Sequence, residues 1–216
     1  MEALDAWLRY VDVLAIAAFA ASGALVAARK RLDPVGFILI GCATGFGGGT
    51  VRDLLIGRTP VFWLSEPLLM GVGVGASVAV FFLAPLVQNQ HRALLWADAA
   101  GMAIYAVLGA EIALRMGAEP WAAVLMGVVT ASFGGVLRDV ICNEIPLILR
   151  QEIYATAAAA GAAVFALLLW QGLAREPAFL AGVAVAFAIR AAGILLGWSL
   201  PVYGARPGLG REHPDR

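Results

Sequence analysis

The sequence predicts an all-α integral membrane protein with seven transmembrane helices, arranged as an inverted repeat of three plus three helices and one further helix. Three observations lead to this prediction. Hydrophobic residues make up 62% of the 216 residues and charged residues only 14%, whereas a soluble domain has about 45–50% and 25%. The apolar residues form runs of roughly 20, the length that crosses a hydrocarbon core of about 30 Å. The first half of the chain also matches the second half.

Seven apolar runs are the expected membrane spans. They lie at residues 10–28, 34–56, 67–87, 97–115, 120–142, 153–171 and 178–199. Short connections rich in proline and charge separate them. All six tryptophans fall at the ends of these spans, as an interfacial aromatic belt requires. Four spans have a proline in their first turn, where the missing N–H costs nothing: Pro34, Pro67, Pro120 and Pro177.

Basic residues divide unequally between the two sides of the predicted bundle. One side holds Arg29, Lys30, Arg31, Arg92, Arg150, Arg206, Arg211 and Arg216, and the other holds Arg9, Arg58, Arg115 and Arg175. The richer side is expected to be cytoplasmic. The N-terminus then lies outside and the C-terminus inside, with the protein in the cell's inner (plasma) membrane. The polar, Gly/Pro-rich tail at residues 200–216 is expected to be cytoplasmic and disordered.

An ungapped match at an offset of 86 residues relates the two halves of the chain. It places Asp12 on Asp98 and matches several glycines, prolines and charged residues in one register. Residues 10–87 are therefore the expected first repeat, residues 97–171 the second, and residues 178–199 an unpaired seventh helix. Because each repeat holds three spans, the second copy enters the membrane upside down. In such proteins the transport path commonly lies between the halves, near helices interrupted by glycine.

Two glycine-rich segments occupy matching positions in the second and fifth spans. The first reads GFGGGTVRDLLIG from residue 45 and contains Gly47, Gly48 and Gly49. The second reads SFGGVLRDVICNE from residue 132 and contains Gly134 and Gly135. We expect these glycines to break or bend the two helices a little past the midplane. Freed backbone groups are tolerated in a membrane only inside protein or beside water, so the segments predict a hydrated path between the repeats. The other interpretation is close helix packing on small residues.

Candidate path residues also include two threonines and two Arg-Asp pairs at matching positions. These are Thr44 and Thr130, Arg52-Asp53, and Arg138-Asp139. Charged residues inside a membrane usually serve function, although an ion pair that only holds helices together is the competing interpretation.

The expected partners of the two arginines lie on other helices, because neighbours i and i+1 on a helix do not face each other. The topology predicts the pairs Asp12–Arg52 and Asp98–Arg138. Asp53 and Asp139 would then be free to attract cations at the two mouths of the path. Arg190, in the seventh span, has no counterpart in the repeat. It could respond to voltage, reach the interface or form an ion pair.

The sequence contains no sign of an enzyme. The two histidines lie in a loop and in the tail, no Ser/His/Asp set can be assembled, and no metal-ligand spacing occurs. No cofactor and no resident metal are expected. No basic stripe with interleaved aromatic residues indicates nucleic-acid binding. Membrane lipid and monovalent cations are the expected partners.

The segments GFGGGTVRDLLIGRTPVFWL and SFGGVLRDVICNEIPLIL resemble those of small bacterial membrane proteins. These are the uncharacterised UPF0126-type or glycine-transporter-domain proteins, prokaryotic relatives of the trimeric intracellular cation (TRIC) channels. The resemblance covers roughly residues 10–200. It implies a homotrimer of seven-helix protomers, each with its own pore that is gated around the bent second and fifth helices and passes monovalent cations, chiefly potassium.

By position, the resemblance assigns the five glycines to the kinks and both Arg-Asp pairs to the charged positions. The second segment has Phe133 where the first has Gly47, so the two halves need not gate alike. A secondary transporter of a small zwitterion such as glycine is the alternative function, since inverted repeats suit both.

Overall fold

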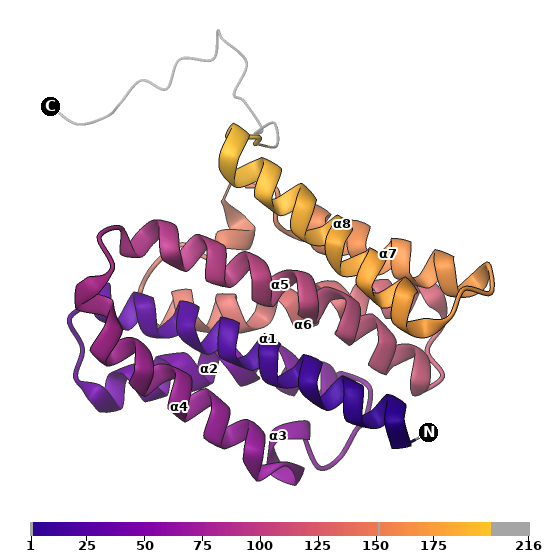
Figure 1. Ribbon diagram of the computed structural model, residues 1–216, viewed down its shortest axis with the longest axis horizontal. Helices are drawn as coiled ribbons and strands as arrows, with labels where there is room; N and C mark the ends of the chain where they lie inside the picture. Colours follow the sequence, from indigo (N-terminus) through magenta and orange to yellow (C-terminus); the bar gives the residue numbers. More distant parts are fainter. Residues whose placement is uncertain (1, 151, 200–216) are drawn as a thin grey trace, which may run out of the picture.

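Helices account for most of residues 2–150 and 152–199, the part of the chain that the computed structural model describes (Figure 1). The α-helices are α1 (Glu2–Arg29), α2 (Pro34–Leu55), α3 (Phe62–Ser65), α4 (Pro67–Leu83), α5 (Gln90–Arg115), α6 (Pro120–Ile141), α7 (Ala155–Trp170) and α8 (Arg175–Leu196). Two 3₁₀ turns, η1 (Ala84–Leu86) and η2 (Leu147–Leu149), follow α4 and α6. The tail predicted at residues 200–216 lies outside the described residues.

Six of these helices are long and apolar enough to cross a membrane: α1 from Trp7, α2, α4 together with η1, α5, α6 and α8. This confirms the prediction of a helical membrane protein. The seventh expected span, α7, is also apolar but has 16 residues. At 1.5 Å per residue it is about 24 Å long, less than the hydrocarbon core of about 30 Å.

Several helix ends differ from the spans expected on hydrophobicity. α5 begins at Gln90 instead of residue 97, because the Asn89 side chain accepts a hydrogen bond from the backbone N–H of Arg92 (2.9 Å) and caps the helix. α8 ends at Leu196 instead of residue 199, because Gly197 adopts a left-handed conformation (φ 66°) that stops the helix. Capping residues, which hydropathy does not register, therefore set both ends.

The helices repeat with the same offset of 86 residues as the sequence. α2 and α6 have matching bounds, Pro34–Leu55 and Pro120–Ile141. Left-handed residues follow at matching places: Arg31 and Gly117 before these helices, and Gly57 and Asn143 after them. The local conformations that begin and end each helix are thus duplicated along with the sequence.

The centre of the bundle consists of α1, α2, α5 and α6, which pack against one another. α4 packs on α1 and α2, and α7 packs in the corresponding place on α5 and α6. α8 packs on α5 and α7 and has no counterpart in the first half. In Figure 1, α4 lies at one side of the bundle and α7 and α8 at the other, with the four central helices between them.

Candidate functional site

The glycine segments lie where α2 and α6 cross. A Cβ atom on Gly48 would come closer than 3.0 Å to the carbonyl oxygen of Thr130, and a Cβ on Gly134 closer than 3.0 Å to that of Thr44. Real Cβ atoms essentially never approach other heavy atoms so closely. The two contacts are reciprocal, and their register is antiparallel. Gly48 and Gly134 are therefore required by close packing of two antiparallel helices.

The glycines do not break these helices, so that part of the expectation is wrong. Both α2 and α6 are continuous α-helices through the glycine segments. The packing interpretation explains the glycines better, because what the crossing needs is the absence of a side chain. A Cβ on Gly47 would meet the end of the flexible Leu137 side chain of α6, and a Cβ on Gly49 would meet the ring of Phe62 in α3. Gly135 differs, since a Cβ there would meet nothing closer than 3.6 Å.

Thr44 and Thr130 belong to the same crossing. Each hydroxyl donates a hydrogen bond of 2.6 Å to the carbonyl four residues earlier in its own helix, that of Ile40 or Met126. Both threonines are buried, and each packs on a glycine of the preceding long helix, Gly23 or Gly109. Their hydroxyls are thus used within the packed structure.

The two Arg-Asp pairs are ion pairs between sequence neighbours, which corrects the expectation that neighbours cannot meet. Arg52 Nε and Nη2 donate to Asp53 Oδ1 at 2.9 and 2.7 Å, and Arg138 Nε donates to Asp139 Oδ1 at 2.7 Å. Both pairs lie in the last turn of their helices. The long arginine side chain can fold back there onto the adjacent carboxylate.

Asp53 and Asp139 are not free carboxylates at the mouths of a path, so that expectation is also wrong. Both are buried. Asp53 Oδ2 accepts a hydrogen bond from the backbone N–H of Phe62 (2.9 Å), and Asp139 Oδ2 accepts one from that of Leu147 (3.0 Å). Each carboxylate therefore fixes the segment that follows its helix.

The two arginines differ in their further partners. Arg138 Nη1 donates to Asp98 Oδ1 at 2.6 Å, which is the predicted pair, and to the Ser22 hydroxyl at 3.0 Å. Arg138 thereby joins α6 to α5 and α1, and all three side chains are fully buried.

The predicted pair between Asp12 and Arg52 is absent. Asp12 Oδ1 is buried and has no hydrogen-bond partner in the described part of the chain. The Arg52 guanidinium is instead engaged by Asp53 and lies 5.5 Å from the centre of the Phe62 ring. Equivalent charged residues thus lie at both ends of the bundle, but they form the predicted ion pair at only one end.

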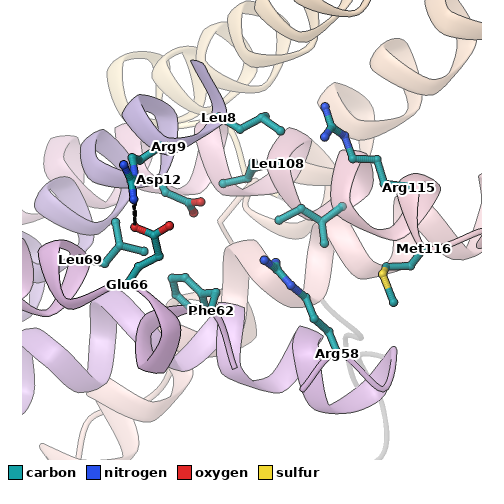
Figure 2. Close-up of a pocket in the computed structure, with 11 residues that line it drawn as sticks. Leu8, Arg9, Asp12, Arg58, Phe62, Glu66, Leu69, Leu108, Arg115 and Met116 are labelled. Atoms are coloured by element: carbon teal, nitrogen blue, oxygen red, sulfur yellow. Dashed lines mark hydrogen bonds and ion pairs between the residues drawn. The ribbon is translucent and has the colours of Figure 1, made fainter. Parts of the chain in front are cut away.

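A cavity of about 370 Å³ lies beside Asp12 (Figure 2). It is lined by Leu8, Arg9, Asp12, Arg58, Phe62, Glu66, Leu69, Leu108, Ile112, Arg115 and Met116. These residues come from α1, from α5 and the residue that follows it, from the start of α4 and from the segment between α2 and α4. We call this space the Asp12 cavity, and the end of the bundle that contains it the Asp12 end. The opposite end, where Arg138 meets Asp98, is the Asp98 end.

Sequence reasoning assigned the cavity's arginines to one side of the membrane but did not single them out as site residues. Arg9 pairs with Glu66, Arg115 with Glu111 at 2.6 Å, and Arg58 approaches Asp53 at 3.8 Å. The sequence feature that could have identified them is that all three arginines lie at span ends on the same predicted side of the membrane.

Two buried tyrosines were not identified by any such sequence feature. Tyr105 and Tyr154 donate hydrogen bonds of 3.0 Å to equivalent backbone carbonyls of α2 and α6, those of Gly45 and Ala131.

Arg190 is buried in the bundle and paired. Its guanidinium contacts the Glu152 carboxylate at 2.5 Å and the Ile153 carbonyl at 3.3 Å, and it lies 5.1 Å from the centre of the Tyr154 ring. Only 1% of the residue is exposed. Of the three alternatives that the sequence left open for Arg190, the structure contains the ion pair. Within the described residues, no group of three or more His, Cys, Asp or Glu side chains is placed to hold a metal ion.

Comparison with known proteins identifies the relatives of this fold. The family model described as "Glycine transporter" matches two segments, residues 9–85 and 95–170. The chain belongs to this family. Family members similar to it include the UPF0126 membrane protein of Vibrio cholerae, 38% identical over 206 residues that cover 93% of this chain and 85% of the relative. The UPF0126 inner membrane protein YadS of Escherichia coli K12 is also 38% identical, over 90% of this chain and 95% of its own.

Solved structures with the same fold are TRIC channels. The TRIC trimeric intracellular cation channel orthologue from Rhodobacter sphaeroides superimposes with a TM-score of 0.85 at 51% identity, covering 88% of this chain and 97% of its own. A prokaryotic TRIC channel crystallised in 0.5 M KCl gives a TM-score of 0.84 at 30% identity, over 93% and 100% of the two chains. The resemblance inferred from the glycine and Arg-Asp motifs is therefore confirmed.

Proposed function

We propose that this protein is a cation channel whose path runs between two inverted three-helix repeats within each protomer. The observation that carries the proposal is that equivalent Asp and Arg residues form an ion pair at one end of the bundle and not at the other. At the Asp12 end, Asp12 and Arg52 stay apart beside a cavity. At the Asp98 end, Asp98 and Arg138 form a buried ion pair. An open vestibule at one end and a closed gate at the other account for this difference.

The closed end is held by Arg138. Its guanidinium bridges Asp98, Asp139 and Ser22, and so ties the second repeat to α1 of the first. A buried arginine with several hydrogen bonds is costly to move unless its partners move with it. Opening would therefore require α1, α5 and α6 to rearrange together.

The crossing of α2 and α6 is the second constriction. Because the packing leaves no room for a Cβ at Gly48 or Gly134, no ion can pass between the helices there. Conduction would require α2 and α6 to separate or slide. The glycines would favour such motion, because the two helices have no side chains at these positions that would interdigitate and resist it.

The membrane arrangement follows from the same fold. We propose seven spans, with α7 short because the bilayer adapts to it, and a location in the inner membrane, as in the relative YadS. The Asp98 end carries Arg29, Lys30 and Arg150 around Glu144. This end is the cytoplasmic one by the positive-inside rule, which puts the N-terminus outside and the C-terminus inside.

Assembly and ion preference rest on the solved relatives. The Rhodobacter sphaeroides protein is described as a trimeric cation channel, and 51% identity over most of both chains supports a homotrimer here. Potassium, the cation of the crystals of another relative, is the proposed permeant ion.

Recording from the purified protein in planar lipid bilayers tests the proposal. A channel gives discrete unitary currents whose reversal potential follows the potassium gradient. A secondary transporter of a small zwitterion would give uptake of radiolabelled glycine into vesicles and no unitary currents. Absence of unitary currents from correctly assembled protein would refute the channel.

A further inference from the structure

The charged residues deep in the bundle are of the same kinds at both ends, so they do not by themselves decide which end closes. The matched sets are Asp12, Arg52 and Asp53 at one end and Asp98, Arg138 and Asp139 at the other. The difference between the ends must therefore come from residues that the two repeats do not share.

One such difference is a reversal of charge just after α2 and α6. Glu144 occupies in the second repeat the place that Arg58 occupies in the first. Each follows a residue in the left-handed conformation. Each backbone N–H also donates to the carbonyl five residues earlier, that of Asp53 (2.8 Å) or Asp139 (2.7 Å). The backbone is thus the same at both places, and only the side chain changes, from positive to negative.

At the Asp98 end, Glu144 joins the two repeats. Its carboxylate lies 3.4 Å from both Arg29 and Lys30, at the end of α1, and 3.7 Å from Arg150. Only 15% of the Glu144 side chain is exposed. Because α1 belongs to the first repeat and Glu144 to the second, these ion pairs fasten the repeats together at this end.

At the Asp12 end, the equivalent residues carry like charges. Arg115 is the counterpart of Arg29 and ends α5 as Arg29 ends α1. Arg58 comes from the first repeat and Arg115 from the second, and both line the Asp12 cavity (Figure 2). Closing this end would bring the two guanidinium groups closer together, which like charges resist.

We propose that this reversal of charge decides which end of the bundle is closed. Glu144 holds the Asp98 end shut by attracting the end of α1, and Arg58 keeps the Asp12 end open by repelling Arg115. Partly exposed ion pairs are individually weak, but three together shift the ratio of two conformations by about tenfold. The inference rests on the proposed function in treating the two ends as the ends of an ion path, but the conformations can be measured without conduction.

The reactivity of a cysteine at Ser22 measures opening of the Asp98 end. Ser22 is fully buried beside Arg138, so its thiol counterpart reacts only when this end opens. Every protein compared carries Ser22→Cys and lacks Cys42 and Cys142. N-Ethylmaleimide is the reagent, because it is uncharged and its approach does not depend on the charge at position 144. The rate of modification is measured on purified protein in mild detergent.

Replacement of Glu144 should speed this modification. We expect Glu144→Gln to raise the rate several-fold and Glu144→Arg, which turns attraction into repulsion, to raise it by about tenfold or more. The control Glu119→Gln changes an exposed acidic residue at the other end of the bundle and should leave the rate unchanged. In 1 M salt, where the Debye length is about 3 Å, the parent protein should also react faster, because the ion pairs are partly exposed.

An exchange of charges separates an ion-pair lock from a loosened fold. Arg29→Glu combined with Glu144→Arg restores an ion pair between the repeats and should slow modification relative to Glu144→Arg alone. Unchanged rates in both single Glu144 variants would overturn the lock. Fast modification that Arg29→Glu fails to slow would also overturn it, because exchanging charges does not repair a loosened fold.

A cysteine at Leu8, which lines the Asp12 cavity, measures the other end. Arg58→Glu gives this end the arrangement of the Asp98 end, with a carboxylate from one repeat and Arg115 from the other. We expect it to slow modification of Leu8→Cys several-fold relative to Arg58→Gln, which removes the charge without reversing it. Equal rates in these two variants would overturn the role of Arg58.

Bilayer recording connects the lock to the proposed function. In a channel, Glu144→Arg should raise the open probability several-fold, and Glu119→Gln should not. Faster modification of Ser22→Cys without any unitary current would leave the lock standing and refute the channel. Unitary currents whose open probability Glu144→Arg does not change, with an unchanged modification rate, would refute the lock and leave the channel standing.

Discussion

Replacing Gly48 with alanine should force α2 and α6 apart. The added Cβ would fall within 3.0 Å of the Thr130 carbonyl oxygen and at 2.9 Å from its carbonyl carbon. These obstacles are backbone atoms, which cannot turn aside as a flexible side chain can. Overpacking of this kind costs about 1–3 kcal/mol, and the rigid obstacle favours the upper part of that range. Alanine also forms helices better than glycine by about 1 kcal/mol, which partly masks the cost.

A matched control removes this helix-propensity contribution. Gly71 lies in α4, and a Cβ there would meet nothing within 4 Å, so Gly71→Ala changes the propensity without overpacking. We expect Gly48→Ala to be less stable than Gly71→Ala by about 1–3 kcal/mol, measured as the free energy of unfolding in a denaturant titration followed by circular dichroism. Gly134→Ala should behave like Gly48→Ala. The double variant should cost less than the sum, because helices already separated accept the second methyl group more easily.

Equal stability of Gly48→Ala and Gly71→Ala would refute the reasoning. It would mean that the α2–α6 crossing is loose enough to accept a methyl group. The requirement for glycine would then have to come from flexibility of the helix and not from close packing.

Three further predictions concern the charged residues and the topology. Asp98→Asn should lower the free energy of unfolding by about 1.5–3 kcal/mol, because it weakens a charged hydrogen bond of the buried Arg138, which keeps Asp139 as a partner. Asp12→Asn at the equivalent position should change it less, because no ion pair is lost there. Similar losses in denaturant titrations would contradict the difference between the ends. Arg190→Gln should destabilise the protein by about 1.5–3 kcal/mol, because it removes charged hydrogen bonds. It should leave the voltage dependence of bilayer currents unchanged. An altered voltage dependence would show that Arg190 responds to voltage. For the topology, single cysteines are placed at the exposed positions Ser65 and Gln88 in a background without Cys42 and Cys142. Ser65→Cys should react with an impermeant thiol reagent added from outside, and Gln88→Cys should react only after the cytoplasm is opened. The reverse pattern would invert the orientation.

Hydropathy and the internal match could predict most of the fold, since a membrane imposes span length and a duplication leaves its register in prolines, glycines and charges. The offset that aligned Asp12 with Asp98 in the sequence also relates the bounds of α2 and α6. Helix ends were less predictable, because single side chains such as Asn89 set them.

The partners of the candidate residues were harder to predict than their positions. A sequence gives the depth of Arg52 but not the direction of its long side chain. Contacts with Asp53 and the Phe62 ring, from the connection after α2, decided that direction. The role of the glycines depended on which helix crosses α2, and that is a property of the tertiary fold. Asp98–Arg138 was predictable because both residues are constrained by two packed helices.

Modification of a cysteine inside the Asp12 cavity during bilayer recording tests the proposed path most directly. Arg58→Cys places a thiol on the cavity wall, and Ser65→Cys places one at an exposed position that does not line the cavity. A bulky, positively charged thiol reagent added at the Asp12 end should irreversibly reduce the potassium current through Arg58→Cys and leave that through Ser65→Cys unchanged. Full current through Arg58→Cys protein shown by mass measurement to be completely modified would contradict a path through this cavity.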